Sequence, residues 1–436
     1  MQGHHTTVSV FEISNLCIAL AILFQVPPGS CVKREKTILE HVTKEWDNSR
    51  LSRDAEQKTL KVTAKTKVAN GNFSAFSLNN KNDFYQFQSA LAKSSESVQI
   101  LIEGSGHRVV ELNLRRNPHN IITKNFITRY YTTSGKPVTQ KAGLNNYFKS
   151  FCYFTGTVSG DITSVSSLNM CDGIRGVIKT ENYTFLLETL PTKSEFWYQF
   201  VLKNGAKSSP WNCKVDSMIL PEDDKRTAGR MVRQIQLPAD HKATTRYIEM
   251  YVVMDHTIYV RTGSLEGTIQ RALDIVNHAS MLYRQMDIYI ALVGVEVWND
   301  EDKITFPLYK GQPGIYDYVK TKKEFSKYRL YNINKHTVND NAQLFFGVKN
   351  DHDGQAALAH ICTRTRSAGV TNDILIDDIA SPAVLMAHEL GHTLGFTHSD
   401  KITRADPNKR ERCECKKEDG VTFDYCILNG NLREYL

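Results

Sequence analysis

The residues best suited to chemistry lie in one short segment, AHELGHTLGFTHSD, at positions 387–400. It places imidazoles at His388, His392 and His398 and a carboxylate at Glu389. Three neutral imidazoles can bind one zinc ion and leave a fourth position open for water, whose pKa zinc lowers to about 7. Glu389 could accept a proton from that water and later deliver it to the leaving amine of a peptide. The residue types therefore predict hydrolysis of peptide bonds at a zinc centre.

A helix must position these groups. Ser381 is expected to be its N-cap and Pro382 its first helical residue, and VLMAHELGHTL then continues without a helix breaker. The first two histidines, four residues apart, share one face of such a helix, and the glutamate is rotated by about 100° from them. Gly395 can adopt a positive φ, so the chain can turn back and bring the third histidine to the metal.

Two other interpretations of this segment remain open. One is a helix with surface histidines, because the shorter pattern HExxH also occurs by chance. The other is a structural zinc site, in which Cys413 or Cys415 would close the fourth position. The full pattern HExxHxxGxxH on an expected helix favours the catalytic interpretation.

The N-terminus is typical of an exported protein. The apolar run Leu16–Val26 precedes PPGSC and the basic run KREK, which predicts a signal peptide over residues 1–30. No later segment approaches 18 consecutive apolar residues, so no membrane anchor is expected and the protein should be secreted and extracellular. Export predicts oxidised cysteines, and Asn72 and Asn182 begin sequons for N-glycosylation.

Length and charge bound the remaining possibilities. The 436 residues are too many for one compact core, so two or three domains are expected. The net charge is +7, but lysines and arginines are interleaved with acidic residues. This pattern indicates solvated faces and excludes nucleic acid as a partner.

The elements expected along the chain divide it in two. Residues 55–205 are rich in expected strands, and alternating apolar residues over 98–102 and 110–114 predict a hairpin. Residues 221–246 are charged and nearly free of large apolar side chains, which predicts an exposed linker. Beyond it, strands are expected at 247–255, 288–298, 342–348 and 355–362, with helices at 265–283 and from about residue 381. Alternating strands and helices predict a mixed α/β layer domain.

Several segments resemble the reprolysins, the adamalysin/ADAM branch of the metzincin metalloproteases. YIEMYVVMD, ALVGVEVW and DNAQLFFGV are similar to the family's strands, MAHELGHTLGFTH to its active-site helix, and FCYFTGTV…NMCDGIRGVI to the ADAM propeptide. The resemblance implies an α/β metzincin catalytic domain, with a mixed, mostly parallel sheet and an active-site helix, preceded by a β-rich propeptide domain. The implied ranges are 1–30 for the signal peptide, 31–233 for the propeptide and 234–436 for a C-terminally incomplete metalloprotease domain.

The resemblance also implies an activity and its control. The chain would be a secreted zinc endopeptidase made as a zymogen, binding protein or peptide substrates as an extended strand along residues 355–362. Its own propeptide would be the inhibitor, with Cys213 on the open zinc position until cleavage after Arg233. The alternative for Cys213 is an ordinary structural half-cystine.

The cysteines and acidic residues complete what the resemblance implies. Disulfides would join Cys152 to Cys171 and Cys415 to Cys426. Glu249 and Asp340 match the first two ligands of the family's calcium site. The remaining cysteines without an assigned partner are Cys31, Cys362 and Cys413.

The end of the sequence at Leu436 leads to a second expected function. Family members continue into a helix with two further cysteines and the last calcium ligands, so a bound Ca²⁺ would have an incomplete site here. A short form of this kind could be catalytically inactive and act as a binding or decoy protein.

Overall fold

The computed structural model describes residues 60–67, 73–94, 97–104, 107–116, 121–141, 152–180, 184–191, 193–203, 245–348, 353–375 and 378–396. The expected signal peptide and the expected linker up to residue 244 lie outside these residues. So do the following predicted site residues: Asn72, Asn182, Cys213, Arg233, His398, Cys415 and Cys426.

The first of two sheets is built from residues 61–203. Its strands are β1 (Lys61–Lys67), β2 (Phe73–Ser77), β3 (Ser97–Gly104), β4 (His107–Arg116), β7 (Tyr153–Val158), β8 (Asp161–Asn169), β9 (Arg175–Lys179), β10 (Thr184–Pro191) and β11 (Phe196–Lys203). They pair antiparallel in the order β11-β10-β9-β8-β7-β4-β3-β1-β2. Helix α4 (Lys81–Ser94) packs against this sheet through Phe84, Phe87 and Leu91. This part is β-rich, as the sequence predicted, and its role as a propeptide stays a prediction.

The second sheet is mixed and mostly parallel. Its strands are β5 (Ile122–Tyr131), β6 (Pro137–Lys141), β12 (Arg246–Met254), β13 (Ile288–Val297), β14 (Asn341–Phe346), β15 (Gly354–Ala356) and β16 (Ala368–Asn372). Their order is β15-β16-β14-β12-β13-β5-β6, and only the two edge strands, β15 and β6, pair antiparallel.

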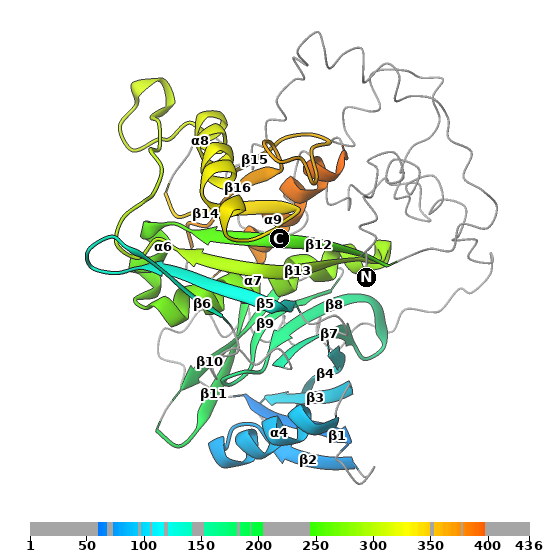
Figure 1. Cartoon of the computed structure of the whole chain (residues 1–436). Coiled ribbons are helices and arrows are strands. Elements are labelled where there is room, and N and C mark those ends of the chain that lie inside the picture. Colours follow the sequence, from blue (N-terminus) through cyan, green and yellow to red (C-terminus); the bar gives the residue numbers. More distant parts are fainter. Residues whose placement is uncertain are drawn as a thin grey trace, which may run out of the picture.

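Helices cover both faces of the second sheet (Figure 1). The helical segments are α6 (His256–Thr262), α7 (Leu265–Tyr283), η3 (Arg284–Met286), η4 (Tyr309–Gly311), α8 (Tyr318–Tyr331), η5 (Ile333–Lys335) and α9 (Ala380–Leu394). Successive side chains of a strand point to opposite faces. Accordingly Met250 and Val252 of β12 pack with α7 and α9, whereas Tyr251 and Val253 pack with α8.

The expected linker does not separate the strands of the first sheet from those of the second. In Figure 1 the β5–β6 hairpin lies along β13, although it precedes residue 233 and falls within the expected propeptide. Helix α7 lies between the sheets, in contact with β13 on one side and with β8 and β9 on the other. The boundary between propeptide and metalloprotease domain therefore stays a prediction, but the N-terminal half contributes strands to the second sheet.

Periodicity predicted most elements correctly. The amphipathic helix is α7, with the predicted ends, and the predicted hairpin is the β3–β4 pair. The strand expected over 355–362 was wrong beyond residue 356. There Ala359 and Cys362 adopt positive φ, which extended strands do not allow. Among the described helices, none combines the length and apolar character that a membrane crossing requires.

Candidate active site

Helix α9 carries the predicted histidine segment and is buried along nearly its whole length. Its N-terminus is stabilised by Asp378, whose carboxylate accepts hydrogen bonds from the backbone N–H of Ser381 at 3.1 Å and from the Ser381 hydroxyl. The expectation that Ser381 is the N-cap was therefore wrong, because Ser381 lies inside the helix and donates to an earlier carboxylate. At the other end Gly395 adopts φ of 105° and ends the helix, at the position where the sequence predicted a turn.

His388 and His392 project from one face of α9 toward each other. Their Nε2 atoms lie 3.0 Å apart, with the ring planes nearly perpendicular at 87°. The Nδ1 atom of His392 lies 2.8 Å from the carbonyl oxygen of Phe396, to which it can donate. That bond leaves the lone pair of the imidazole on Nε2, on the side facing His388.

This geometry fits a zinc ion. Two nitrogen ligands of a tetrahedral zinc, each bound at about 2.0–2.1 Å, lie about 3.3 Å apart, close to the observed separation of the Nε2 atoms. Both imidazoles are buried, at 0% and 2% exposure. Within the described residues no group of three or more metal-binding side chains is assembled. The third expected ligand, His398, lies outside them.

Glu389 lies beside the histidine pair and against the edge of the second sheet. A Cβ atom added to Gly354 of β15 would come within 2.4 Å of Oε1 of Glu389. Because residue 354 is glycine, the Glu389 carboxylate can occupy this space. The Glu389 carbonyl also accepts a bond from the Thr393 hydroxyl at 3.1 Å.

The segment after β15 turns onto the C-terminal end of α9. The N–H groups of Ala359 and Ile361 donate to the carbonyls of His392 and Thr393, each at 2.9 Å. The last carbonyls of a helix have no partner within the helix, so these bonds satisfy them. They also fix the distance between the sheet edge and the histidine-bearing turn.

Side chains of helix α7 bind the segment that precedes α9 and α9 itself. Arg271, 6% exposed, pairs through Nε and Nη2 with the buried carboxylate of Asp373 and also donates to the carbonyls of Leu375 and Asp378. Burial tends to lower the pKa of Arg271, but Asp373 outweighs that effect and the net shift is upward. The Tyr283 hydroxyl donates to the carbonyl of Ala387. These contacts were not predicted, because no local pattern in the sequence indicates an ion pair between residues 102 positions apart.

The two predicted calcium ligands, Glu249 and Asp340, are joined by a hydrogen bond. The Asp340 carboxylate accepts from the backbone N–H of Glu249 at 2.9 Å and from the Cys362 thiol at 3.4 Å. Burial and the nearby Asp340 raise the pKa of the Cys362 thiol to about 12. Cys362 forms no disulfide with another described cysteine, whereas the structure contains a disulfide between Cys152 and Cys171.

A buried helix with two facing imidazoles, against an edge strand of a mixed sheet, is an arrangement suited to a metal centre. Residues 246–435 match the family described as Reprolysin (M12B) family zinc metalloprotease. The chain belongs to this reprolysin family through that region.

A relative among the curated proteins agrees with the family. Over 338 residues the chain is 32% identical to the Mus musculus protein named Disintegrin and metalloproteinase domain-containing protein 12. The match covers 76% of this chain and 34% of that protein, so the chain spans about a third of the length of the relative.

Two solved structures are similar at low scores. One is metalloproteinase-II from Bacteroides fragilis, at 13% identity and a TM-score of 0.35, covering 73% of this chain and 86% of that one. The other belongs to a structure titled "Structure of a chaperone-substrate complex", at 18% identity and a TM-score of 0.27, covering 35% and 24%. At these scores neither supports a statement about this fold.

Proposed function

We propose that the chain is a zinc-dependent endopeptidase, secreted as a zymogen. The observation that carries the proposal is the pair of buried Nε2 atoms 3.0 Å apart on α9. Glu389 directly follows the first of these two histidines. His388, His392 and His398 would hold zinc, which when bound supplies an acidified water and polarises a carbonyl. Glu389 would accept a proton from that water and deliver it to the leaving amine.

Strand β15 provides a place for the substrate. It is one of the two edge strands of the second sheet and lies directly beside Glu389. An extended peptide can pair with the outer edge of β15, with main-chain hydrogen bonds supplying much of the affinity. Because β15 is short, the following turn at 357–361 would contact the rest of the peptide.

The zymogen part of the proposal rests on sequence. Cys213 would bind the open zinc position as a thiolate, and cleavage after Arg233 in the charged segment 221–246 would release it. Asn72 and Asn182 would be glycosylated and Cys415 would pair with Cys426. Glu249 and Asp340 would contribute to a calcium site, and their proximity in the structure supports that assignment.

The proposal is tested with the full chain, cleaved after Arg233, by measuring zinc content and hydrolysis of a quenched peptide library. Replacing Glu389 by Gln should lower kcat/KM by at least about 100-fold and leave one zinc per chain, because the glutamate transfers protons without binding the metal. Replacing His388 by Ala should remove both zinc and activity.

The matched control is Glu266→Gln, which changes an exposed glutamate in the first turn of α7. Its activity should equal that of the unmodified chain. Protein that binds zinc stoichiometrically yet hydrolyses no peptide would contradict the enzyme and favour the binding or decoy function.

A further inference from the structure

Positive charge is concentrated on helix α8 and the short turn that follows it. Residues 318–336 contain six lysines and arginines and one glutamate, a surplus of five positive charges, and the net charge of the whole chain is +7. The interleaving of basic and acidic residues that the sequence shows as a whole therefore does not hold in this segment. A local surplus of one sign raises the concentration of oppositely charged partners near a surface.

The lysines of α8 form a row on its outer side. Lys320, Lys323 and Lys327 follow one another at spacings of three and four residues, so their side chains share one face of the helix. The side chains of Lys320 and Lys327 are 61% and 54% exposed, and Lys323 is exposed as well. The inner side of the helix is marked by its buried residues: Tyr318, Thr321, Phe325, Tyr328 and Arg329.

Part of this charge is not neutralised by the protein itself. Lys320 pairs with Asp317 at 3.0 Å and Lys327 with Glu324 at 2.7 Å. Lys323, between them, forms no ion pair with an acidic side chain in the part of the chain that the structure describes. Like charges three or four residues apart destabilise a helix. A bound anion would relieve this repulsion.

A loop from another part of the chain extends the row of cations. Arg329 donates to the carbonyls of Thr363 and Arg364 at 2.8 and 3.1 Å, and Asn334 donates to the carbonyl of Arg364 at 3.3 Å. These bonds hold the backbone of Arg364 against the residue that precedes Lys335. The side chains of Lys335 and Arg364 are both exposed. We call the surface formed by Lys320, Lys323, Lys327, Lys335 and Arg364 the basic face.

The basic face lies next to the strand on which a substrate would pair. Helix α8 contacts both β15 and β16 (Figure 1). At its start, the Tyr318 hydroxyl donates to the carbonyl of Asp353, immediately before β15, at 2.9 Å. At its end, Arg329 binds the loop at 363–364. The two ends of α8 are thus tied to the two ends of the segment that contains the edge strand.

We propose that the basic face is an exosite for an acidic segment of the protein substrate. This inference rests on the proposed function and specifies its substrate class, a protein with a run of aspartates or glutamates near the peptide that pairs with β15. The contact between α8 and β15 favours a protein, because one polypeptide can reach both surfaces. Tyr331, 59% exposed in the same row of α8, adds aromatic surface of the kind that is enriched at protein interfaces.

The first test measures binding without catalysis. The full chain carrying Glu389→Gln is titrated into a fluorescent octaglutamate peptide, and Kd is measured by anisotropy at about 50 mM and about 300 mM salt. The peptide should bind, more weakly at the higher salt, and an octaglutamine peptide should not bind. Adding Lys323→Gln, Lys335→Gln and Arg364→Gln together should raise Kd about tenfold or more, because three exposed ion pairs are lost.

The matched control is the combination of Lys65→Gln, Lys136→Gln and Lys141→Gln, which removes the same charge from exposed lysines of β1 and of the β5–β6 hairpin. Its Kd should stay within about twofold of the value without these changes, and circular dichroism checks that both triple variants are folded. Equal Kd values for the two triple variants would overturn the proposal. Binding of a sulfated oligosaccharide to the basic face, without binding of octaglutamate, would also overturn it.

A second test separates this inference from the proposed function. The chain cleaved after Arg233 is given a quenched peptide with and without an octaglutamate extension. The extension should lower KM about tenfold for the unmodified chain, and this advantage should disappear in the variant of Lys323, Lys335 and Arg364. If neither peptide is hydrolysed, the proposed function fails and the anisotropy result alone decides on the exosite. Hydrolysis of both peptides with equal KM would overturn the exosite and leave the proposed function intact.

Discussion

Glycine at position 354 leaves room for the Glu389 carboxylate, which any larger residue would displace. Gly354 lies on the edge strand β15, and the Glu389 carboxylate fills the space that a methyl group would need. The glutamate is on a helix and the glycine on a strand, so the contact holds the carboxylate between two rigid elements. Replacing the glycine tests whether this placement matters to the reaction.

Gly354→Ala should displace the carboxylate and lower kcat/KM by about 100-fold, since a misplacement of about 1 Å is enough for such a loss. Zinc content should be unchanged, because the three atoms nearest to the added methyl group all belong to Glu389 and none to a histidine. Peptide hydrolysis and metal analysis on the same sample check the prediction. Unmodified turnover with a folded Gly354→Ala protein would show that the carboxylate is free to move.

The sequence predicted the residues of this site unequally well. The two histidines and the glutamate follow from spacing along one helix, because four residues are close to one helical turn. Gly354 gave no such signal. Its contact with Glu389 arises from the order of strands in the sheet, and no period in the sequence encodes that order. The same holds for the hydrogen bond between Tyr131 and Glu296, which are 165 positions apart.

At the scale of elements, α9 is positioned by an ion pair that α7 makes with the preceding loop. Arg271 binds Asp373 through two nitrogens, and both side chains are almost fully buried, at 6% and 0% exposure. Removing one member of a buried pair leaves an uncompensated charge, which costs about 3–5 kcal/mol. Exposed pairs contribute at most about 1 kcal/mol.

Arg271→Met should therefore lower the free energy of unfolding by about 3–5 kcal/mol, measured by chemical denaturation. Lys320→Met is the control. Lys320 pairs with Asp317 at 3.0 Å, but its side chain is 61% exposed, so a loss below about 0.5 kcal/mol is expected. Equal losses for the two variants would mean that the buried pair does not stabilise the junction of α7 and α9.

Elements themselves were easier to predict than their partners. Amphipathic spacing identified α7, and alternation identified β3 and β4, because each pattern reports burial on one face. No pattern in the sequence indicated that β5 and β6 would leave their neighbours in the chain and join a sheet formed by residues 246–372. The short β15 was overextended for a related reason: residues 357–361, which are apolar except for His360, turn onto the end of α9 and do not continue the strand.

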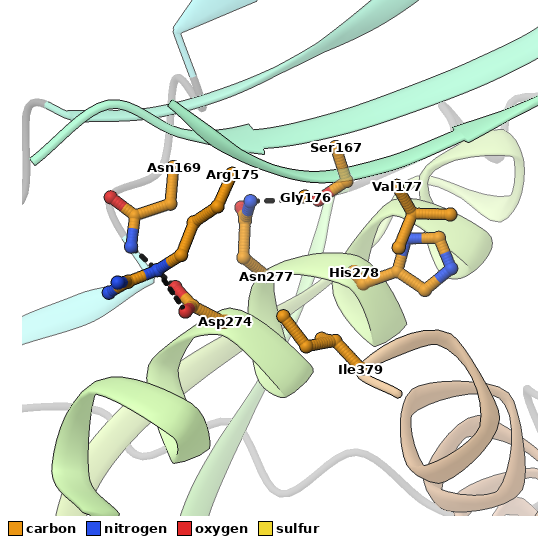
Figure 2. A pocket seen from close by; sticks show the side chains of 9 residues that line it. All are labelled: Ser167, Asn169, Arg175, Gly176, Val177, Asp274, Asn277, His278 and Ile379. Atoms are coloured by element: carbon orange, nitrogen blue, oxygen red, sulfur yellow. Dashed lines mark hydrogen bonds and ion pairs between the residues drawn. The ribbon is translucent and has the colours of Figure 1, made fainter. Parts of the chain in front are cut away.

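At the scale of the whole molecule, the two sheets meet across α7, and His278 lies at that contact. It is 4% exposed and borders a small cavity that Val177, Arg175 and Asp274 also line (Figure 2). Burial, with a contribution from the positive charge of Lys179, lowers the pKa of His278 to about 4, and Asp378 opposes the shift. Burial likewise lowers the pKa of Lys179, to about 8. At low pH, protonated His278 would therefore add a second positive charge near that of Lys179.

Because the folded pKa of His278 lies below its ordinary value of 6.5, its contribution to stability is complete above that pH and is lost as the pH falls toward 4. Between about pH 7.5 and about pH 5 this residue alone should cost about 2 kcal/mol of unfolding free energy. His278→Gln should remove that part of the pH dependence in urea titrations, whereas His336→Gln, at an exposed position, should retain it. If both variants lost stability on acidification as steeply as the unmodified chain, the charge on His278 would have no part in holding the sheets together.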